Sequence, residues 1–134
     1  MKIYLAGRYS RRAELAGYAA QLRAMGHEVT SRWLDGEHEA VELGGKATRS
    51  DEAEWACADA HDVLRADMLV AFTEADGGGR RGGRHVEFGL AVAWDKDLAI
   101  IGPREHLFHS MCDVQEYGSF AEFMGEIGVV EVPV

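Results

Sequence analysis

The segment 76–89 combines residue types that could bind an anion and attack an electrophilic carbon. It reads Asp-Gly-Gly-Gly-Arg-Arg-Gly-Gly-Arg-His-Val-Glu-Phe-Gly and runs into an apolar helical pattern, with Glu87 one turn inside it. Glycines allow the backbone to approach a ligand closely, and arginines carry a permanent charge that suits phosphate or carboxylate. Glu87, an acid beside such a loop, is therefore a possible nucleophile or base.

The same segment also has a simpler interpretation. The loop could be solvated, with arginines that only keep it soluble and with Glu87 favoured in the first helical turn by the helix dipole. No Gly-Lys-Ser/Thr follows the glycines, so the loop is not a Walker A motif, and it does not fit the dinucleotide glycine fingerprint. Glycine content alone does not separate these interpretations.

Two groups of arginines each directly follow an expected strand. They are Arg8, Arg11 and Arg12 after 2–6, and Arg80, Arg81 and Arg84 after 66–73. In an open α/β sheet, ligands bind at the carboxyl ends of the strands, where helix N-termini favour anions. The formal net charge of −9 argues against a long nucleic acid as a partner. An acidic chain with two local arginine groups predicts a small anionic ligand.

Strands and helices are expected to alternate along the chain. Apolar segments predict strands at 2–6, 27–33, 66–73, 98–102 and 114–117. Helices are expected over 11–25, over 47–64, from the glycine-arginine loop to about 94, and over 119–127. Ser10 and Ser119 are the expected N-caps of the first and last helices, and Glu122 should complete a capping box. The polar segment 34–46 predicts a loop.

This alternation predicts a single flavodoxin-like, Rossmann-like three-layer α/β domain over 1–134. Its sheet should be parallel and five-stranded, in the order 2-1-3-4-5, because right-handed crossovers favour that arrangement. The first and third strands are then neighbours, and the topological switch point lies between them. Both arginine groups should converge on one crevice there.

Length and composition fit one domain with a real core, since 47% of the 134 residues are hydrophobic. The apolar run at the N-terminus is short for a signal peptide, and no run reaches the roughly 18 apolar residues of a membrane span. We therefore expect a cytoplasmic protein without a membrane partner. Cys57 and Cys112 lack metal-ligand spacing and are expected to be reduced thiols.

Some other side chains could take part in binding. His106 and His109 could hold a metal, but no helical pattern or third ligand is evident, so a loop or capping role is favoured and no metal is predicted. His85 could contact a substrate or lie exposed. Aromatic rings usually pack in the core, although three could stack on a base. These are Trp33, Trp55 and Tyr9, of which Tyr9, after the first strand, is preferred.

Several segments together resemble the nucleoside 2-deoxyribosyltransferase superfamily, which includes N-hydrolases of nucleoside 5'-monophosphates. They are Ile-Tyr-Leu-Ala-Gly near the start, Ala-Asp before the apolar strand, Gly-Arg-His-Val-Glu-Phe-Gly-Leu-Ala, Asp-Lys-Asp and Leu-Ala-Ile-Ile-Gly-Pro. The resemblance covers about 1–105 and is strongest at 66–102. It implies a nucleoside or nucleotide substrate and a homodimer or larger assembly; we expect no cofactor.

The resemblance also implies roles for individual residues. Glu87 matches the nucleophile that attacks the anomeric carbon, Asp59 matches the acid near the departing base, and Tyr4 matches the tyrosine that orients the glutamate. Arg81 departs from the pattern, because the transferases carry an aspartate there and the monophosphate hydrolases a small hydroxyl residue. Its charge suits a phosphate and would recognise a neutral 5'-hydroxyl poorly, which favours nucleotides.

The chemistry of N-glycosidic cleavage calls for the same residue types. Positive charge builds on the sugar, so a carboxylate near the anomeric carbon stabilises or captures it. The departing base needs a proton, which a second carboxyl group, kept protonated by burial or by its like-charged neighbour, can supply. Asp59 is preferred for that role and Asp62 is the alternative. Without the resemblance, either could be a solvent-facing helix acid.

We therefore predict cleavage of a nucleoside 5'-monophosphate to free base, with Glu87, Asp59 and Tyr4 as the catalytic residues. Phosphate contacts are expected from Arg81 with Arg11 or Arg12. Base exchange by a deoxyribosyltransferase and a non-catalytic nucleotide-binding or sequestering module are the alternatives. The residues expected to bind substrate line the predicted crevice: Gly7, Arg8, Tyr9, Arg11, Arg12, Arg81, Gly82, Gly83, Arg84 and His85.

Overall fold

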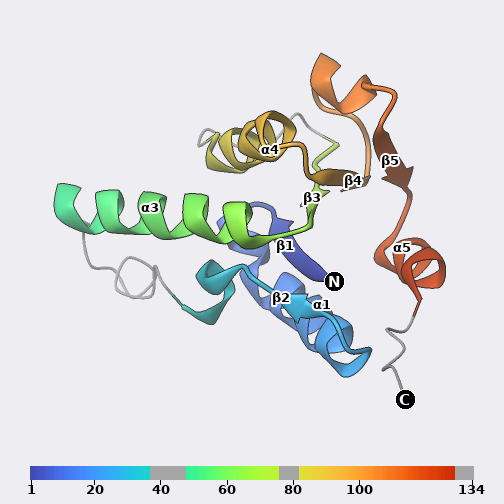
Figure 1. The fold of residues 1–134 in the computed structure, drawn as a ribbon, viewed down its shortest axis with the longest axis horizontal. Coiled ribbons are helices and arrows are strands. Elements are labelled where there is room, and N and C mark those ends of the chain that lie inside the picture. Colours follow the sequence, from blue (N-terminus) through green and yellow to red (C-terminus); the bar gives the residue numbers. More distant parts are fainter. Residues whose placement is uncertain (37–47, 76–81, 129–134) are drawn as a thin grey trace.

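A computed structural model describes residues 1–36, 48–75 and 82–128, in which strands and helices alternate around one parallel sheet (Figure 1). The strands are β1 (Lys2–Ala6), β2 (Glu28–Val29), β3 (Met68–Phe72), β4 (Asp97–Ile101) and β5 (Val114–Tyr117). Their order is β2-β1-β3-β4-β5, and every neighbouring pair is parallel. This confirms the predicted α/β class and strand order.

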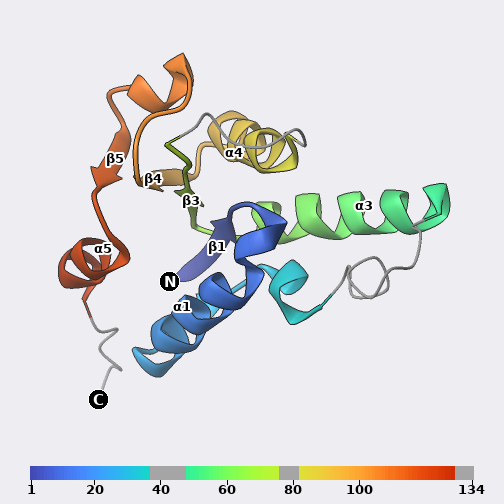
Figure 2. The same ribbon diagram turned by 180° about the vertical axis from the view of Figure 1, so that it is seen from behind.

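Helices cover both faces of the sheet. Figures 1 and 2 show α1 (Arg12–Ala24) and α5 (Phe120–Ile127) on one face, with α3 (Arg49–Arg65) and α4 (Gly83–Ala93) on the other. Three short 3-10 turns, η1 (Tyr9–Arg11), η2 (Arg32–Asp35) and η3 (Leu107–Ser110), lie in the connections. Every described helix is too short or too polar to cross a membrane.

The core follows the central strand. All five residues of β3 are buried, as expected for a continuous apolar run between two helical layers. β3 pairs with β1 through Ala71 opposite Ala6, and with β4 through Phe72 opposite Ile101. The carboxyl ends of β1 and β3 therefore lie side by side, as the predicted crevice requires.

The second strand is shorter than predicted. Only Glu28 and Val29 pair with β1, although the alternating pattern extends over 27–33. Two side chains explain the early end. The Ser31 Oγ accepts the backbone N–H of Leu5 at 2.7 Å, and the Thr30 hydroxyl donates to the carbonyl of Asp62 at 2.8 Å. Because a side chain takes the backbone donor that would extend the ladder, the chain turns into η2.

The predicted caps are partly correct. Ser119 is the N-cap of α5, and its hydroxyl accepts the backbone N–H of Glu122. The Glu122 carboxylate accepts the backbone N–H of Gly118 and not that of Ser119, so the predicted capping box does not form. Ser10 was predicted wrongly as an N-cap. It lies inside η1, where the Arg11 N–H already donates to the Arg8 carbonyl at 2.9 Å, and α1 begins only at Arg12.

Candidate active site

Three elements bring together the three residues expected to do chemistry. Tyr4 is fully buried in β1, and its hydroxyl donates a hydrogen bond to the Glu87 Oε2 on α4. Asp59 comes from α3, and its charge acts on the same hydroxyl. A tyrosine and two carboxylates, separated by up to 83 positions in sequence, thus form one cluster on the sheet face that α3 and α4 cover.

Tyr4 is held in its protonated form. Burial raises its pKa well above the ordinary value, and the negative charges of Glu87 and Asp59 add to this effect, because ionisation would place a third negative charge beside them. The phenol therefore remains a hydrogen-bond donor over the whole neutral range. A buried donor of this kind fixes one oxygen of Glu87.

The two aspartates of α3 differ in their surroundings. Asp62 is fully buried and accepts hydrogen bonds from the Arg32 backbone N–H at 3.1 Å and from the Arg32 Nε at 2.9 Å. The Arg65 guanidinium lies 3.6 Å from the same carboxylate oxygen, Oδ1. Asp62 therefore anchors η2 to α3. Asp59 is half-buried, with one carboxylate oxygen inaccessible to solvent.

Arg11 joins the two strand ends that were expected to form a crevice. Its guanidinium lies 3.2 Å from Glu74, which follows β3, and 2.7 Å from Glu14 on α1. Both carboxylates raise its pKa, so its charge is permanent and shared between them. Arg12 instead donates to the Leu34 carbonyl at 3.0 Å, and Arg8 is the half-buried residue that precedes η1.

Arg84 is buried, with 6% of its side chain exposed, and it forms a bidentate ion pair with Glu105, which is 2% exposed. The Glu105 carboxylate also accepts the backbone N–H of Glu74 at 3.3 Å. The sequence pattern predicted that Arg84 contacts the substrate. In the structure, its guanidinium pairs with Glu105 and so connects α4 to the segment after β4. The spacing of these two residues gave no signal of their pairing.

The glycines of the site differ in what they permit. A Cβ at Gly7 would meet a Leu15 methyl at 2.9 Å, so Gly7 allows α1 to pack closely. Gly82 has φ −89°, which any residue can adopt, and both Gly82 and Gly83 have open space where a side chain would stand. Arg81, Arg80 and the glycines at 77–79 lie outside the described residues, so the phosphate contact of Arg81 stays a prediction.

The aromatic residues separate into core and surface. Trp33 is buried and donates its Nε1–H to the Leu5 carbonyl at 2.9 Å, which is the usual core role. Tyr9 is half-buried, with its ring 6.2 Å from that of Trp33 and the Arg12 guanidinium 5.9 Å above it. Trp55 is half-buried on α3.

Sequence reasoning missed a group of three histidines. It found no third partner for His106 and His109, but the structure places His85 beside them, with one ring nitrogen of each within 4.8 Å of the others. The predicted strand order could have indicated this group. Because β3 and β4 are neighbours, the first turn of α4, which contains His85, lies next to the segment after β4, which contains His106 and His109.

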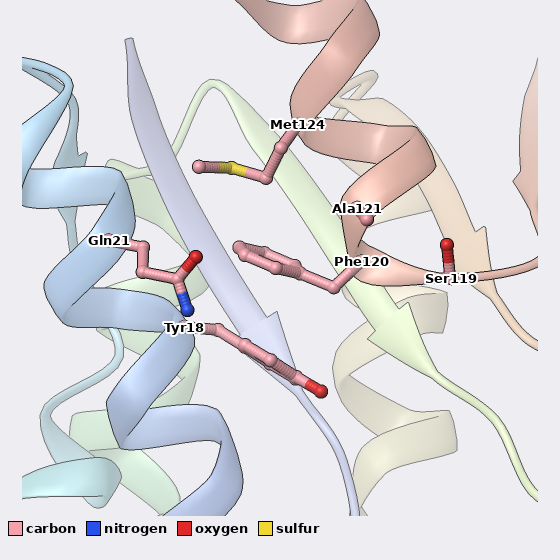
Figure 3. A pocket seen from close by; sticks show the side chains of 6 residues that line it. All are labelled: Tyr18, Gln21, Ser119, Phe120, Ala121 and Met124. Atoms are coloured by element: carbon pink, nitrogen blue, oxygen red, sulfur yellow. The ribbon is translucent and has the colours of Figure 1, made fainter.

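A shallow groove on the opposite face of the sheet lacks comparable chemistry. It lies between α1 and α5, where the rings of Tyr18 and Phe120 stack at 4.1 Å and Met124 lies on the Phe120 side (Figure 3). Gln21 and Ser119 are polar residues in its lining. The described residues that line this groove include no carboxylate.

No sequence-family model and no curated protein matches the chain. Two solved structures are similar to it over nearly their whole length. One is the CMP N-glycosidase BcmB of Clostridium botulinum, with a TM-score of 0.59, 17% identity and coverage of 95% of this chain and 98% of that one. The other is a 2-deoxyribosyltransferase of Bacillus psychrosaccharolyticus, with a TM-score of 0.71, 15% identity and coverage of 99% and 100%.

The chain has the same fold as these two proteins. This confirms the fold that the resemblance implied. By their names, the two neighbours are enzymes, one a glycosidase of a nucleotide and one a transferase used for nucleoside synthesis. Because both are under 25% identical to this chain, the likeness concerns the fold, and the activity must be argued from the residues.

Proposed function

We propose that the protein cleaves the N-glycosidic bond of a nucleoside 5'-monophosphate and releases the free base. The observation that carries this proposal is the hydrogen bond from the buried Tyr4 hydroxyl to Glu87, with Asp59 near the same hydroxyl. One carboxylate that a fixed donor orients and a second carboxyl group nearby are what such a reaction needs.

In the proposed reaction, Glu87 acts at the anomeric carbon. As the bond from sugar to base breaks, its carboxylate either stabilises the oxocarbenium-like sugar or bonds to it covalently. Asp59, in its protonated form, delivers a proton to the departing base. A water molecule then attacks the anomeric carbon, displaces Glu87 where a covalent bond has formed, and returns a proton to Asp59. Tyr4 restricts the rotation of the Glu87 carboxylate and leaves Oε1 to approach the sugar.

The 5'-phosphate would lie at the carboxyl ends of β1 and β3. The open backbone at Gly82 and Gly83, at the start of α4, supports this placement, because free N–H groups at a helix start favour anions. Arg8, Arg12 and Arg81 supply charge, with Tyr9 and His85 at the margin. Arg11 would contact phosphate only if it shared its guanidinium with Glu14 and Glu74.

Hydrolysis is preferred to base exchange. Transfer requires a site that admits a second base while it excludes water. No described feature of the chain provides such a second base site. The alternatives of transfer and of binding without catalysis are separated by experiment.

The deciding experiment measures base release. A panel of nucleoside 5'-monophosphates and the corresponding nucleosides is incubated with the protein, with and without a second free base, and products are separated by chromatography. We expect free base from a monophosphate and no exchanged nucleoside. Detectable ligand binding without base release from any substrate would contradict the enzymatic proposal, and exchange without hydrolysis would establish the transferase.

The variant Glu87→Gln tests the nucleophile. It keeps the size of the side chain and removes its negative charge, so we expect turnover to fall by a factor of at least about a hundred while ligand binding persists. The control is Glu54→Gln, because Glu54 is exposed on α3. Unchanged turnover in Glu87→Gln would exclude Glu87 as the nucleophile.

A further inference from the structure

Three histidine side chains meet beside the first turn of α4. His85 belongs to that turn, while His106 directly precedes η3 and His109 lies within it. The His106 and His109 rings are 3.7 Å apart between centroids, and the His85 and His106 rings are 4.8 Å apart. No step of the proposed glycosidic reaction uses this group.

The ring nitrogens are spaced like ligands of one metal ion. His85 Nδ1 and His106 Nε2 are 3.2 Å apart, and Zn–N bonds of roughly 2.0–2.1 Å in tetrahedral geometry place two nitrogens about 3.4 Å apart. The nitrogen that each residue offers lies within 4.8 Å of the other two. A small adjustment of the rings therefore brings all three to one ion.

One of the proposed ligand nitrogens is buried and lacks a partner. Over residues 1–36, 48–75 and 82–128, His109 Nε2 has no hydrogen-bond partner. His109 is only 1% exposed, so this nitrogen is removed from water, and native proteins rarely leave such atoms unsatisfied. The ring is held in place, because Phe88 packs edge-on against it at 4.8 Å.

The nearest charged groups are paired with each other. The guanidinium of Arg84 forms a bidentate ion pair with Glu105. Glu105 Oε1 lies 3.9 Å from His85 Nε2, the ring nitrogen of His85 that would not bind the ion.

We propose that His85, His106 and His109 form a binding site for a borderline divalent transition metal such as Zn²⁺, which would clamp the first turn of α4 to η3. Three imidazoles without a bound carboxylate favour this class of ion over Mg²⁺ or Ca²⁺. His85 is partly exposed, so the fourth position faces solvent and would hold water. The proposal is independent of the glycosidase assignment.

Binding requires one local change. His109 Nδ1 accepts the backbone N–H of Glu105 at 3.0 Å, so the neutral ring carries its proton on Nε2. When Nε2 binds the ion, this proton must move to Nδ1, and the contact with the Glu105 N–H opens. The backbone amide of Glu105 therefore responds when the ion binds His109.

The experiment uses the full chain without an affinity tag, after treatment with a chelator. Zn²⁺ is titrated by calorimetry, Co²⁺ by its visible absorption, and the Glu105 amide is followed by ¹⁵N NMR. We expect one ion per chain, the intense absorption of tetrahedral Co²⁺, and a shift of the Glu105 resonance. His106→Ala should weaken Zn²⁺ binding by at least about tenfold, and His61→Ala, an exposed change on α3, should leave it unchanged.

Circular dichroism establishes that His106→Ala is folded; if it is not, His85→Gln replaces it, because His85 is partly exposed and tolerates substitution more readily. The proposal is overturned if the wild-type chain shows no saturable Zn²⁺ binding. It is equally overturned if His61→Ala weakens binding as much as the variant of the group, or if the Glu105 amide does not respond to the ion.

Discussion

Tyr4 orients the Glu87 carboxylate, because its phenol offers a single, directional hydrogen-bond donor. Its side chain is fully buried, and burial together with two nearby carboxylates raises its pKa. In the proposed reaction, the hydrogen bond from Tyr4 helps to hold the Glu87 carboxylate in the orientation that presents Oε1 to the anomeric carbon.

The variant Tyr4→Phe should therefore lower kcat on the order of a hundredfold and change KM little. Phenylalanine fills the same space, so the fold should persist, and the effect should arise from the lost hydrogen bond to Glu87. Steady-state release of base from the preferred monophosphate measures both constants.

Tyr18→Phe provides the matched control for this change. The Tyr18 hydroxyl also donates to a carboxylate, Glu14, at 2.9 Å, but it does so in the groove between α1 and α5. Its kcat should equal that of the wild-type enzyme. A Tyr4→Phe enzyme with unaltered kcat would show that Glu87 needs no orienting donor.

At the scale of elements, the close approach of α1 to the end of β1 decides where the arginines after β1 lie. Gly7 makes this approach possible, because a side chain there would press against Leu15, which is itself fully buried. The turn η1 then directs Arg11 across to the end of β3. Close packing at one glycine thus helps to position the rim of the site.

Gly7→Ala should lower the free energy of unfolding by about 1–3 kcal/mol, since the added Cβ must displace a core methyl group. Gly17→Ala, on α1, is the control. Among the described residues, nothing beyond its chain neighbours and the backbone of α1 lies within 4 Å of its added Cβ, and alanine favours a helix, so this variant should gain roughly 0.5–1 kcal/mol. Urea unfolding of both variants checks the opposite signs. Equal effects would mean that contact with Leu15 is not the cause.

Elements whose pattern is local were predictable from sequence, and those that depend on distant partners were not. The apolar runs of β1, β3 and β4 need no tertiary information, and they fix the strand order that makes the crevice. The early end of β2 depends on Ser31 meeting Leu5, 26 positions away. The same limit applies in the site. Glu87 follows from its place after a strand, whereas the partner of Arg84 lies 21 positions away without any periodic signal.

At the scale of the whole molecule, the sheet separates two kinds of surface. The face under α3 and α4 contains the Tyr4 cluster, and the three histidines join the first turn of α4 to η3. The groove between α1 and α5 is mainly apolar and aromatic (Figure 3). Because negative charge is concentrated around a buried phenol in the first of these regions, the stability of the fold should depend on pH at the alkaline end.

The direction of this dependence follows from proton binding. Tyr4 has a higher pKa in the folded protein than in the unfolded chain, where a tyrosine titrates near 10. Above about pH 10, the unfolded state has released this proton and the folded state retains it, so rising pH favours unfolding. The contribution of Tyr4 to stability is complete below pH 10 and is lost as the pH rises toward its folded pKa.

Wild-type protein should therefore lose unfolding free energy more steeply than Tyr4→Phe between pH 10 and the folded pKa of Tyr4, by up to about 1.4 kcal/mol for each pH unit. Urea unfolding curves at a series of pH values from neutral to alkaline measure the difference. Other groups that titrate in this range are common to both proteins and cancel in the comparison. If the unfolding free energies of the wild-type and Tyr4→Phe proteins change with pH in parallel, the phenol ionises as easily in the folded protein as in the unfolded chain. The Tyr4 hydroxyl would then not be the permanent donor on which the orientation of Glu87 depends.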